Sequence, residues 1–199
     1  MKSVKFLVLI TIGMLFKTTG QSQVKLPITD NQIRTEMEKV VKDYFNQFTN
    51  IRGEEIADNP QSTDYKSTIT LNGSEECSIT KYSSKKNNVW SWQAVMLTTE
   101  EFAKAKRNFQ SLFNQLNNLS VSFESQPGCL FKGNFSAPTE AKKFTSVVFS
   151  ADSKDEALKP LKIELTLEYK IIEWQVKIVV YGKEREDNEP ASSESSSSL

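Results

Sequence analysis

The sequence contains no histidine, and this absence removes a large block of chemistry. Without an imidazole the chain has no Ser-His-Asp or Cys-His catalytic group, no HExxH zinc site and no histidine pH switch. Glycine is sparse as well, and none of the seven glycines falls in a GxxxxGK or GxGxxG phosphate-binding pattern. We therefore expect no metal, no cofactor and no catalytic residues of a recognised type.

The chain also lacks an excess of charge of either sign, with 25 basic and 25 acidic side chains. The first twenty residues hold three lysines and no acid, so a chain cut after Gly20 carries 22 positive and 25 negative charges. That balance gives no electrostatic reason to expect a nucleic acid or an anionic membrane as a partner.

Residues 1–20 have the pattern of a secretory signal peptide. Two lysines precede an apolar run from Phe6 to Phe16, and Thr18 and Gly20 place small residues before the expected cut. The run is about half as long as a membrane-spanning helix requires. We expect an exported protein, periplasmic or extracellular, with no membrane span after signal cleavage.

The two ends of the remaining chain differ sharply in composition. From Gly182 onward the sequence is charged and then almost entirely serine, so 182–199 is predicted to be a disordered, acidic and serine-rich tail. The intervening residues 26–181 suit one domain with one hydrophobic core.

Two segments of that domain have the apolar spacing of amphipathic helices. A capping box, Thr98-x-x-Glu101, precedes the second segment. The two stripes are Ile33, Met37, Val40, Val41, Tyr44, Phe45 and Phe48, and then Phe102, Ala105, Phe109, Leu112, Phe113 and Leu116.

Most of the other segments look like strands, and from Leu161 to Tyr169 apolar residues alternate with polar ones. A reversal must fall near Lys170–Ile172, although no Gly, Asn or Pro marks it. The predicted class is α+β, with two amphipathic helices packed on a twisted, mainly antiparallel sheet. The predicted strands are 67–71, 77–82, 89–97, 119–124, 129–135, 144–150, 161–169 and 172–181.

Short strings recur in the two halves of the domain. The end of the first helix, 45–51, resembles 113–119 at the end of the second, and Trp92-Gln93 resembles Trp174-Gln175. These matches suggest a duplicated unit of one helix plus strands, whose halves would pair into one sheet. Convergence of residue types at helix–sheet junctions is the alternative.

Cys77 and Cys129 are the only cysteines. In an oxidising compartment we expect them to form a disulfide. Two separate buried thiols are the alternative. A cysteine nucleophile is not expected, because no histidine is present to act as its base.

Trp90 and Trp92 lie two residues apart and would project from one face of a strand. With Trp174 they would form the aromatic wall of a binding surface for a sugar, a lipid or a peptide. The competing interpretation places all three in the core, because aromatic residues are common in sheets.

Other chemistry lacks the spacing it would need. Two S-x-x-K strings, at Ser78 and Ser83, fall in a strand and a turn, where serine and lysine would not meet. The acidic stretch 53–64, which we expect to be irregular, lacks the alternating ligands of a calcium loop.

Taken together, these features favour an exported, non-enzymatic module that binds a small ligand or a protein partner. A carboxylate-based hydrolase acting on an envelope or extracellular substrate is the first alternative, although no spacing brings two acids together. A structural envelope protein is the second. The ligand and the oligomeric state are not specified by the sequence.

Overall fold

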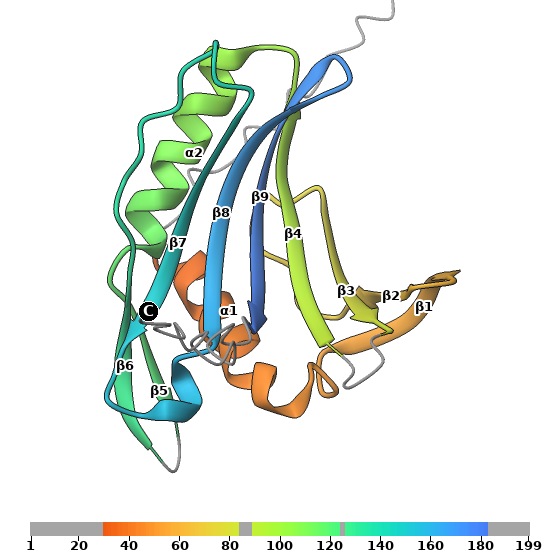
Figure 1. Cartoon of the computed structure of the whole chain (residues 1–199), viewed down its shortest axis with the longest axis vertical. Coiled ribbons are helices and arrows are strands. Elements are labelled where there is room, and N and C mark those ends of the chain that lie inside the picture. Colours follow the sequence, from red (N-terminus) through yellow and green to blue (C-terminus); the bar gives the residue numbers. More distant parts are fainter. Residues whose placement is uncertain (1–29, 84–88, 124–125, 183–199) are drawn as a thin grey trace, which may run out of the picture.

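The computed structural model describes residues 30–83, 89–123 and 126–182. The predicted signal peptide and nearly all of the predicted tail lie outside these ranges. The described chain forms α1 (Asp30–Asp43), the short 3-10 helix η1 (Tyr44–Asn46), β1 (Arg52–Asn59), β2 (Ser62–Ser67), β3 (Glu76–Tyr82), β4 (Val89–Thr99), α2 (Phe102–Leu116), β5 (Leu119–Phe123), β6 (Gln126–Lys132), β7 (Phe144–Asp152), the 3-10 helix η2 (Glu156–Leu158), β8 (Leu161–Lys170) and β9 (Glu173–Gly182) (Figure 1).

The strands form one nine-stranded sheet in the order β1-β2-β3-β4-β9-β8-β7-β6-β5. Neighbours pair antiparallel along this order. Strands β4, β7, β8 and β9 are long and curve across the molecule (Figure 1). The α+β class predicted from the sequence is therefore confirmed, as a large antiparallel sheet with two helices.

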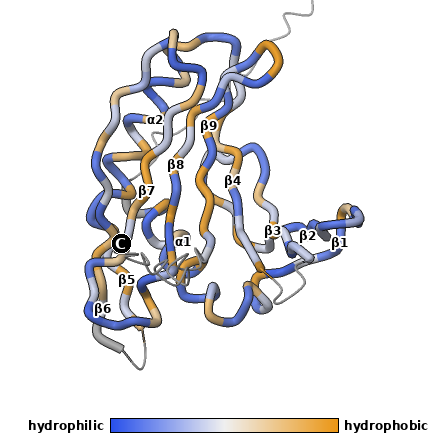
Figure 2. Tube along the Cα trace, in the orientation of Figure 1, coloured by the Kyte–Doolittle hydropathy of each residue, from blue (hydrophilic) through white to orange (hydrophobic). Residues whose placement is uncertain are grey.

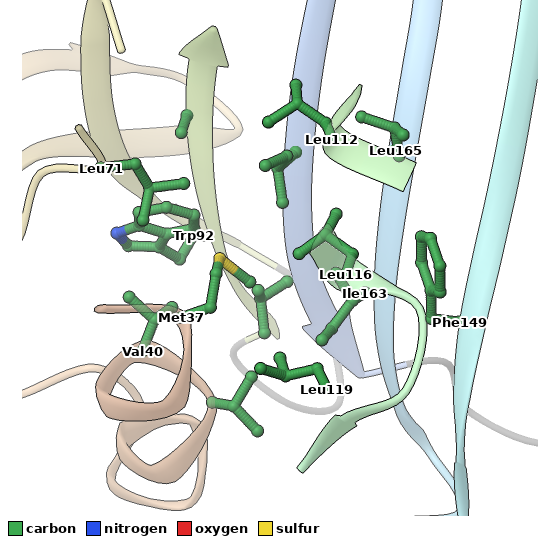
Figure 3. Close-up of a cluster of buried hydrophobic side chains, with 14 of the residues drawn as sticks. Met37, Val40, Leu71, Trp92, Leu112, Leu116, Leu119, Phe149, Ile163 and Leu165 are labelled. Carbon is green, nitrogen blue, oxygen red and sulfur yellow. The ribbon is translucent and has the colours of Figure 1, made fainter. Parts of the chain in front are cut away.

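The core lies between the sheet and the two helices. Helix α2 packs on β4, β8 and β9, while α1 contacts β5 and α2. Figure 3 shows Met37 from α1 and Leu116 from α2 among sheet residues such as Trp92 and Ile163. All four side chains are fully buried, and most of the two predicted apolar stripes faces the core, but Phe45 is 43 % exposed because α1 ends at Asp43 and Phe45 lies in η1.

The alternation along the last two strands also holds. In β8, Leu161, Ile163, Leu165 and Leu167 are fully buried, and in β9 every second residue from Trp174 to Val180 is buried. The intervening residues form the opposite, more polar face of the sheet. Period-two alternation predicted this because only one face of these strands meets the helices.

The first strands were predicted wrongly. The segment 67–71 is not a strand, because β2 ends at Ser67, and the acidic stretch expected to be irregular forms the β1–β2 hairpin. Strand β1 is exposed from Glu54 to Asn59, and the hairpin projects from the side of the molecule (Figure 1). A strand that is wet on both faces shows no alternation, which explains the error.

Two residues, Ile171 and Ile172, connect β8 to β9, and Lys170 pairs with Glu173. The reversal predicted near Lys170–Ile172 is thus confirmed. The backbone of Ile171 has φ 62°, which β-branched residues rarely adopt.

The two halves of the chain meet at the centre of the sheet. β4 pairs with β9, so that the strands carrying Trp92 and Trp174 are neighbours. The first half contributes four strands and the second contributes five. The matched strings also differ in backbone, since Gln47 and Phe48 have positive φ in one and Asn118 in the other. The duplication stays a prediction.

The predicted disulfide is not formed, because Cys77 and Cys129 are both free and buried. Cys77 lies in β3 and Cys129 in β6, five strand positions apart. At about 4.8 Å per position this is about 24 Å along the sheet, whereas a disulfide needs Cα atoms within about 7 Å. The order of the strands in the sheet keeps the two cysteines too far apart to bond, and this order could not be predicted from the sequence.

Thiol counting tests the correction. With Ellman's reagent and no reductant, we expect almost no reaction from the folded protein, since both side chains are buried and burial raises the pKa of the Cys129 thiol. Two thiols should react after denaturation. A count of zero in denaturant would show that the two cysteines are bonded.

Candidate functional site

The three tryptophans proposed as one aromatic wall do not form one. Trp92 is fully buried, and its Nε1 donates a hydrogen bond to Ser67 Oγ at 2.9 Å. Trp174 is 2 % exposed and pairs with Thr99, seven residues along β4 from Trp92. Because β4 has a register shift between Val95 and Leu97, this corresponds to six residues along β9, or about 20 Å at about 3.4 Å per residue. Both are core residues in separate parts of the sheet.

Trp90 is only partly buried and belongs to a cluster at the rim of the helix-covered face. Its ring centroid is 6.1 Å from that of Tyr65, and the Arg52 guanidinium lies 4.7 Å above the indole and 5.2 Å from the tyrosine ring. Lys81 Nζ lies 5.7 Å from the same indole. Cation–π contacts of this kind attach the β1–β2 hairpin to β4. Because Arg52 and Lys81 already lie over the Trp90 ring, the cluster holds the hairpin against the sheet and does not present an open aromatic surface.

Trp174 belongs to a second cluster, beneath the β8–β9 connection. Its ring packs on Phe102 at 4.9 Å and on Tyr169 at 5.0 Å. Lys143 Nζ lies 4.3 Å from the Tyr169 ring and 5.2 Å from the Trp174 ring. The cluster joins the start of α2 to β8 and β9, and it provides a rigid base for the hairpin.

The hairpin tip, defined here as residues 169–173, is the most exposed apolar feature of the described chain. Ile171 is 87 % exposed and Ile172 is 64 % exposed, and Tyr169 beside them is 38 % exposed. Figure 2 shows this end of the β8–β9 hairpin as a strongly hydrophobic loop. The tip is the candidate site.

The residue choice at the tip works against the fold. Two-residue hairpin connections favour Asn-Gly, Asp-Gly or a leading Gly, because the first residue has positive φ. Isoleucine at that position costs about 1–2 kcal/mol, and the exposure of both side chains means that little burial offsets the cost. Backbone strain that no burial of the side chain offsets is typical of functional positions.

Two acidic residues of the first half of the chain, Glu54 and Glu75, each have a partner that is not an acid. Glu54 pairs with Lys66 at 3.9 Å, and Glu75 accepts hydrogen bonds from Thr98 N and Oγ1 at 2.9 and 2.8 Å. Within 30–83, 89–123 and 126–182, no group of three or more Cys, Asp and Glu side chains is placed to hold a metal.

One titratable group on the polar face of the sheet is strongly shifted. Burial, followed by the charge of Glu164 and a hydrogen bond with it, raises the pKa of Tyr181 to about 12. The unfolded chain releases this proton near its ordinary pKa of about 10, while the folded chain retains it. The contribution of Tyr181 to the free energy of unfolding is therefore fully present below about pH 10 and is lost as the pH rises toward about 12.

We expect Tyr181→Phe to lose less stability than wild type between pH 9 and pH 11 in urea unfolding, because phenylalanine has no proton to retain. The exposed Tyr82 provides the matched control, Tyr82→Phe. An equal loss of stability in Tyr181→Phe and wild type over this range would contradict the expectation.

Comparison with known proteins adds little to this geometry. No family model and no curated protein matches the chain. A structural search finds the extracellular domain of PknH from Mycobacterium tuberculosis, at 11 % identity and a TM-score of 0.33, covering 81 % of this chain and 90 % of that one. At this TM-score the likeness supports no argument about fold or function.

Among the described helices, none has the length and apolar character needed to cross a membrane.

Proposed function

We propose that the chain is an exported, non-enzymatic binding module that makes contact through the β8–β9 hairpin tip. The single observation that carries this proposal is the exposure of Ile171 and Ile172 on a tight connection. Ile171 has a positive φ there, a backbone conformation that isoleucine disfavours. Export rests on the signal-like pattern of residues 1–20. The tip presents the apolar surface, and the cluster of Phe102, Tyr169 and Trp174 holds it in place.

The distribution of exposed apolar residues supports the tip over the rest of the surface. Other exposed large apolar side chains, such as Ile56 on β1 and Leu130 on β6, are not next to one another in sequence, and the two that share a strand, Phe144 and Val148 on β7, are four residues apart. Single exposed apolar residues are normal on soluble proteins, whereas contiguous exposed apolar surface is typical of contact sites. The long edge strand β1 is a poorer candidate, because two register shifts and the acids Glu54, Glu55 and Asp58 protect it against pairing.

Site-directed photo-cross-linking tests the proposal. A benzoylphenylalanine placed at Ile172, and in a second variant at Ile56, is irradiated in the cells that produce the protein. We expect adducts from position 172 and not from position 56, which is also an exposed isoleucine. Equal yields at the two positions, or the absence of any protein or lipid adduct at 172, would contradict a contact through the tip.

A further inference from the structure

We infer that the hairpin tip binds a lipid surface, into which Ile171 and Ile172 insert. This inference rests on the proposed function, because it names the partner of the same site. Three observations lead to it: the size and shape of the apolar surface, the order of side chains along the hairpin, and the charges around the tip.

The apolar surface is too small and too convex for a standard protein interface. Two isoleucine side chains present on the order of 200 Å² of apolar area, whereas a standard interface buries about 800 Å² on each partner. The hairpin narrows to two residues at its end (Figure 1). A lipid surface accepts a narrow apolar projection without needing a matching shape.

The strand register places the side chains of the hairpin in layers. The aliphatic Ile171 and Ile172 form the apex, Lys170 pairs with Glu173 in the next layer, and Tyr169 pairs with Trp174 in the third. Each layer adds about 3.4 Å, so the aromatic layer lies about 7 Å from the apex. Interfacial segments insert by about 5–10 Å.

The apex and the layer below it fit a lipid–water interface, with the two isoleucines in the acyl region and the Lys170–Glu173 pair at the headgroups. In the third layer only Tyr169, at 38 % exposed, can reach the boundary region that aromatic rings favour, while Trp174 is 2 % exposed and stays in the core as its support. The amino group of Lys143 lies over both rings of the aromatic layer, where a cation would meet lipid phosphate.

The charges around the tip indicate insertion rather than electrostatic adsorption. Lys142, Lys143 and Lys170 are exposed near the tip, and so is the acid Glu140, while Glu173 is partly exposed. These groups nearly cancel. The affinity should therefore come from apolar burial and depend little on salt or on anionic lipid.

A fluorophore at the tip tests the inference locally. The full-length protein carrying Ile172→Cys is labelled with the environment-sensitive dye NBD and titrated with phosphatidylcholine vesicles. Ile56→Cys is the matched control, and the wild-type protein reports background labelling of the two buried native cysteines. Because the dye reports its own surroundings, membrane contact by residues 1–29 does not produce the signal.

We expect the emission at position 172 to shift to the blue and to be quenched by nitroxide lipids, while position 56 stays unchanged. Adding Ile171→Ser should raise the half-saturating lipid concentration about tenfold, because one buried aliphatic side chain is lost. An unchanged emission at 172, or a shift that appears only with phosphatidylglycerol at low salt, would overturn the inference.

The two proposals fail separately. A silent dye together with a protein adduct from position 172 would overturn the lipid inference and leave the binding module standing. The absence of any position-specific adduct, with a silent dye, would overturn both.

Discussion

Replacing Trp92 with alanine is expected to lower the free energy of unfolding by about 3–5 kcal/mol. Trp92 lies in β4 near the centre of the sheet and is fully buried. Figure 3 shows its ring close to Leu71 and the side chains of α1. A domain is typically stable by about 5–15 kcal/mol, so the cavity would remove a large part of the margin.

The conservative variant Trp92→Phe separates packing from hydrogen bonding. It retains most of the ring but loses the bond from Nε1 to Ser67 Oγ, so we expect a cost of about 1–2 kcal/mol. Urea unfolding followed by circular dichroism measures all variants, with Trp90→Phe at the partly exposed rim as the control. An alanine variant as stable as wild type would show that Trp92 is not a core residue.

The second large effect is expected at Asp43, a carboxylate that is 5 % exposed. Its Oδ2 accepts hydrogen bonds from the backbone N–H groups of Asn50 and Ile51 at 3.0 and 3.2 Å. Its Oδ1 accepts hydrogen bonds from the side-chain amide groups of Asn50 and Asn46 at 2.5 and 3.1 Å. Asp43 thereby organises the turn between α1 and β1, which contains two left-handed residues.

We expect Asp43→Ala to cost about 2–4 kcal/mol, because it leaves buried backbone donors without a partner. The free energy of unfolding of Asp43→Asn should lie between those of the wild type and Asp43→Ala, because the asparagine side chain keeps one acceptor oxygen. The exposed Asp58→Ala is the control and should cost little. Equal stabilities of Asp43→Ala and Asp58→Ala in urea unfolding would contradict this role.

Where one face of an element meets the core, the sequence predicted the structure well. The stripes of α1 and α2 and the alternation of β8 and β9 are direct consequences of burial on one side. The first helix nevertheless ends at Asp43 rather than continuing through Phe48. The buried carboxylate and the turn it binds override the apolar spacing there.

Features that depend on distant contacts were not predictable in the same way. The β1–β2 hairpin is held partly by Arg52, whose guanidinium lies over the rings of Tyr65 and Trp90. The three residues belong to three different strands, β1, β2 and β4. The expected capping box failed for a similar reason, because Thr98 bonds to Glu75 and not to the start of α2. The cysteines stay apart because four strands lie between theirs.

The candidate site left a signal in the sequence, but in the form of an absence. The reversal at Lys170–Ile172 lacked the Gly, Asn or Pro that such a turn favours, and the proposed function takes this departure as its sequence signal. Trp174, considered as part of a binding wall, lies beneath that turn as support. The exposure of the two isoleucines required the structure.

Whether Ile171 and Ile172 serve a contact rather than the fold is tested most directly by the unfolding free energy of the double variant Ile171→Gly, Ile172→Ser. Glycine relieves about 1–2 kcal/mol of backbone strain and costs about 0.5–1 kcal/mol in chain flexibility. We therefore predict a variant that is more stable than wild type by up to about 1 kcal/mol in urea. A variant less stable by 1 kcal/mol or more would show that the isoleucines support the fold and would contradict their assignment to a binding surface.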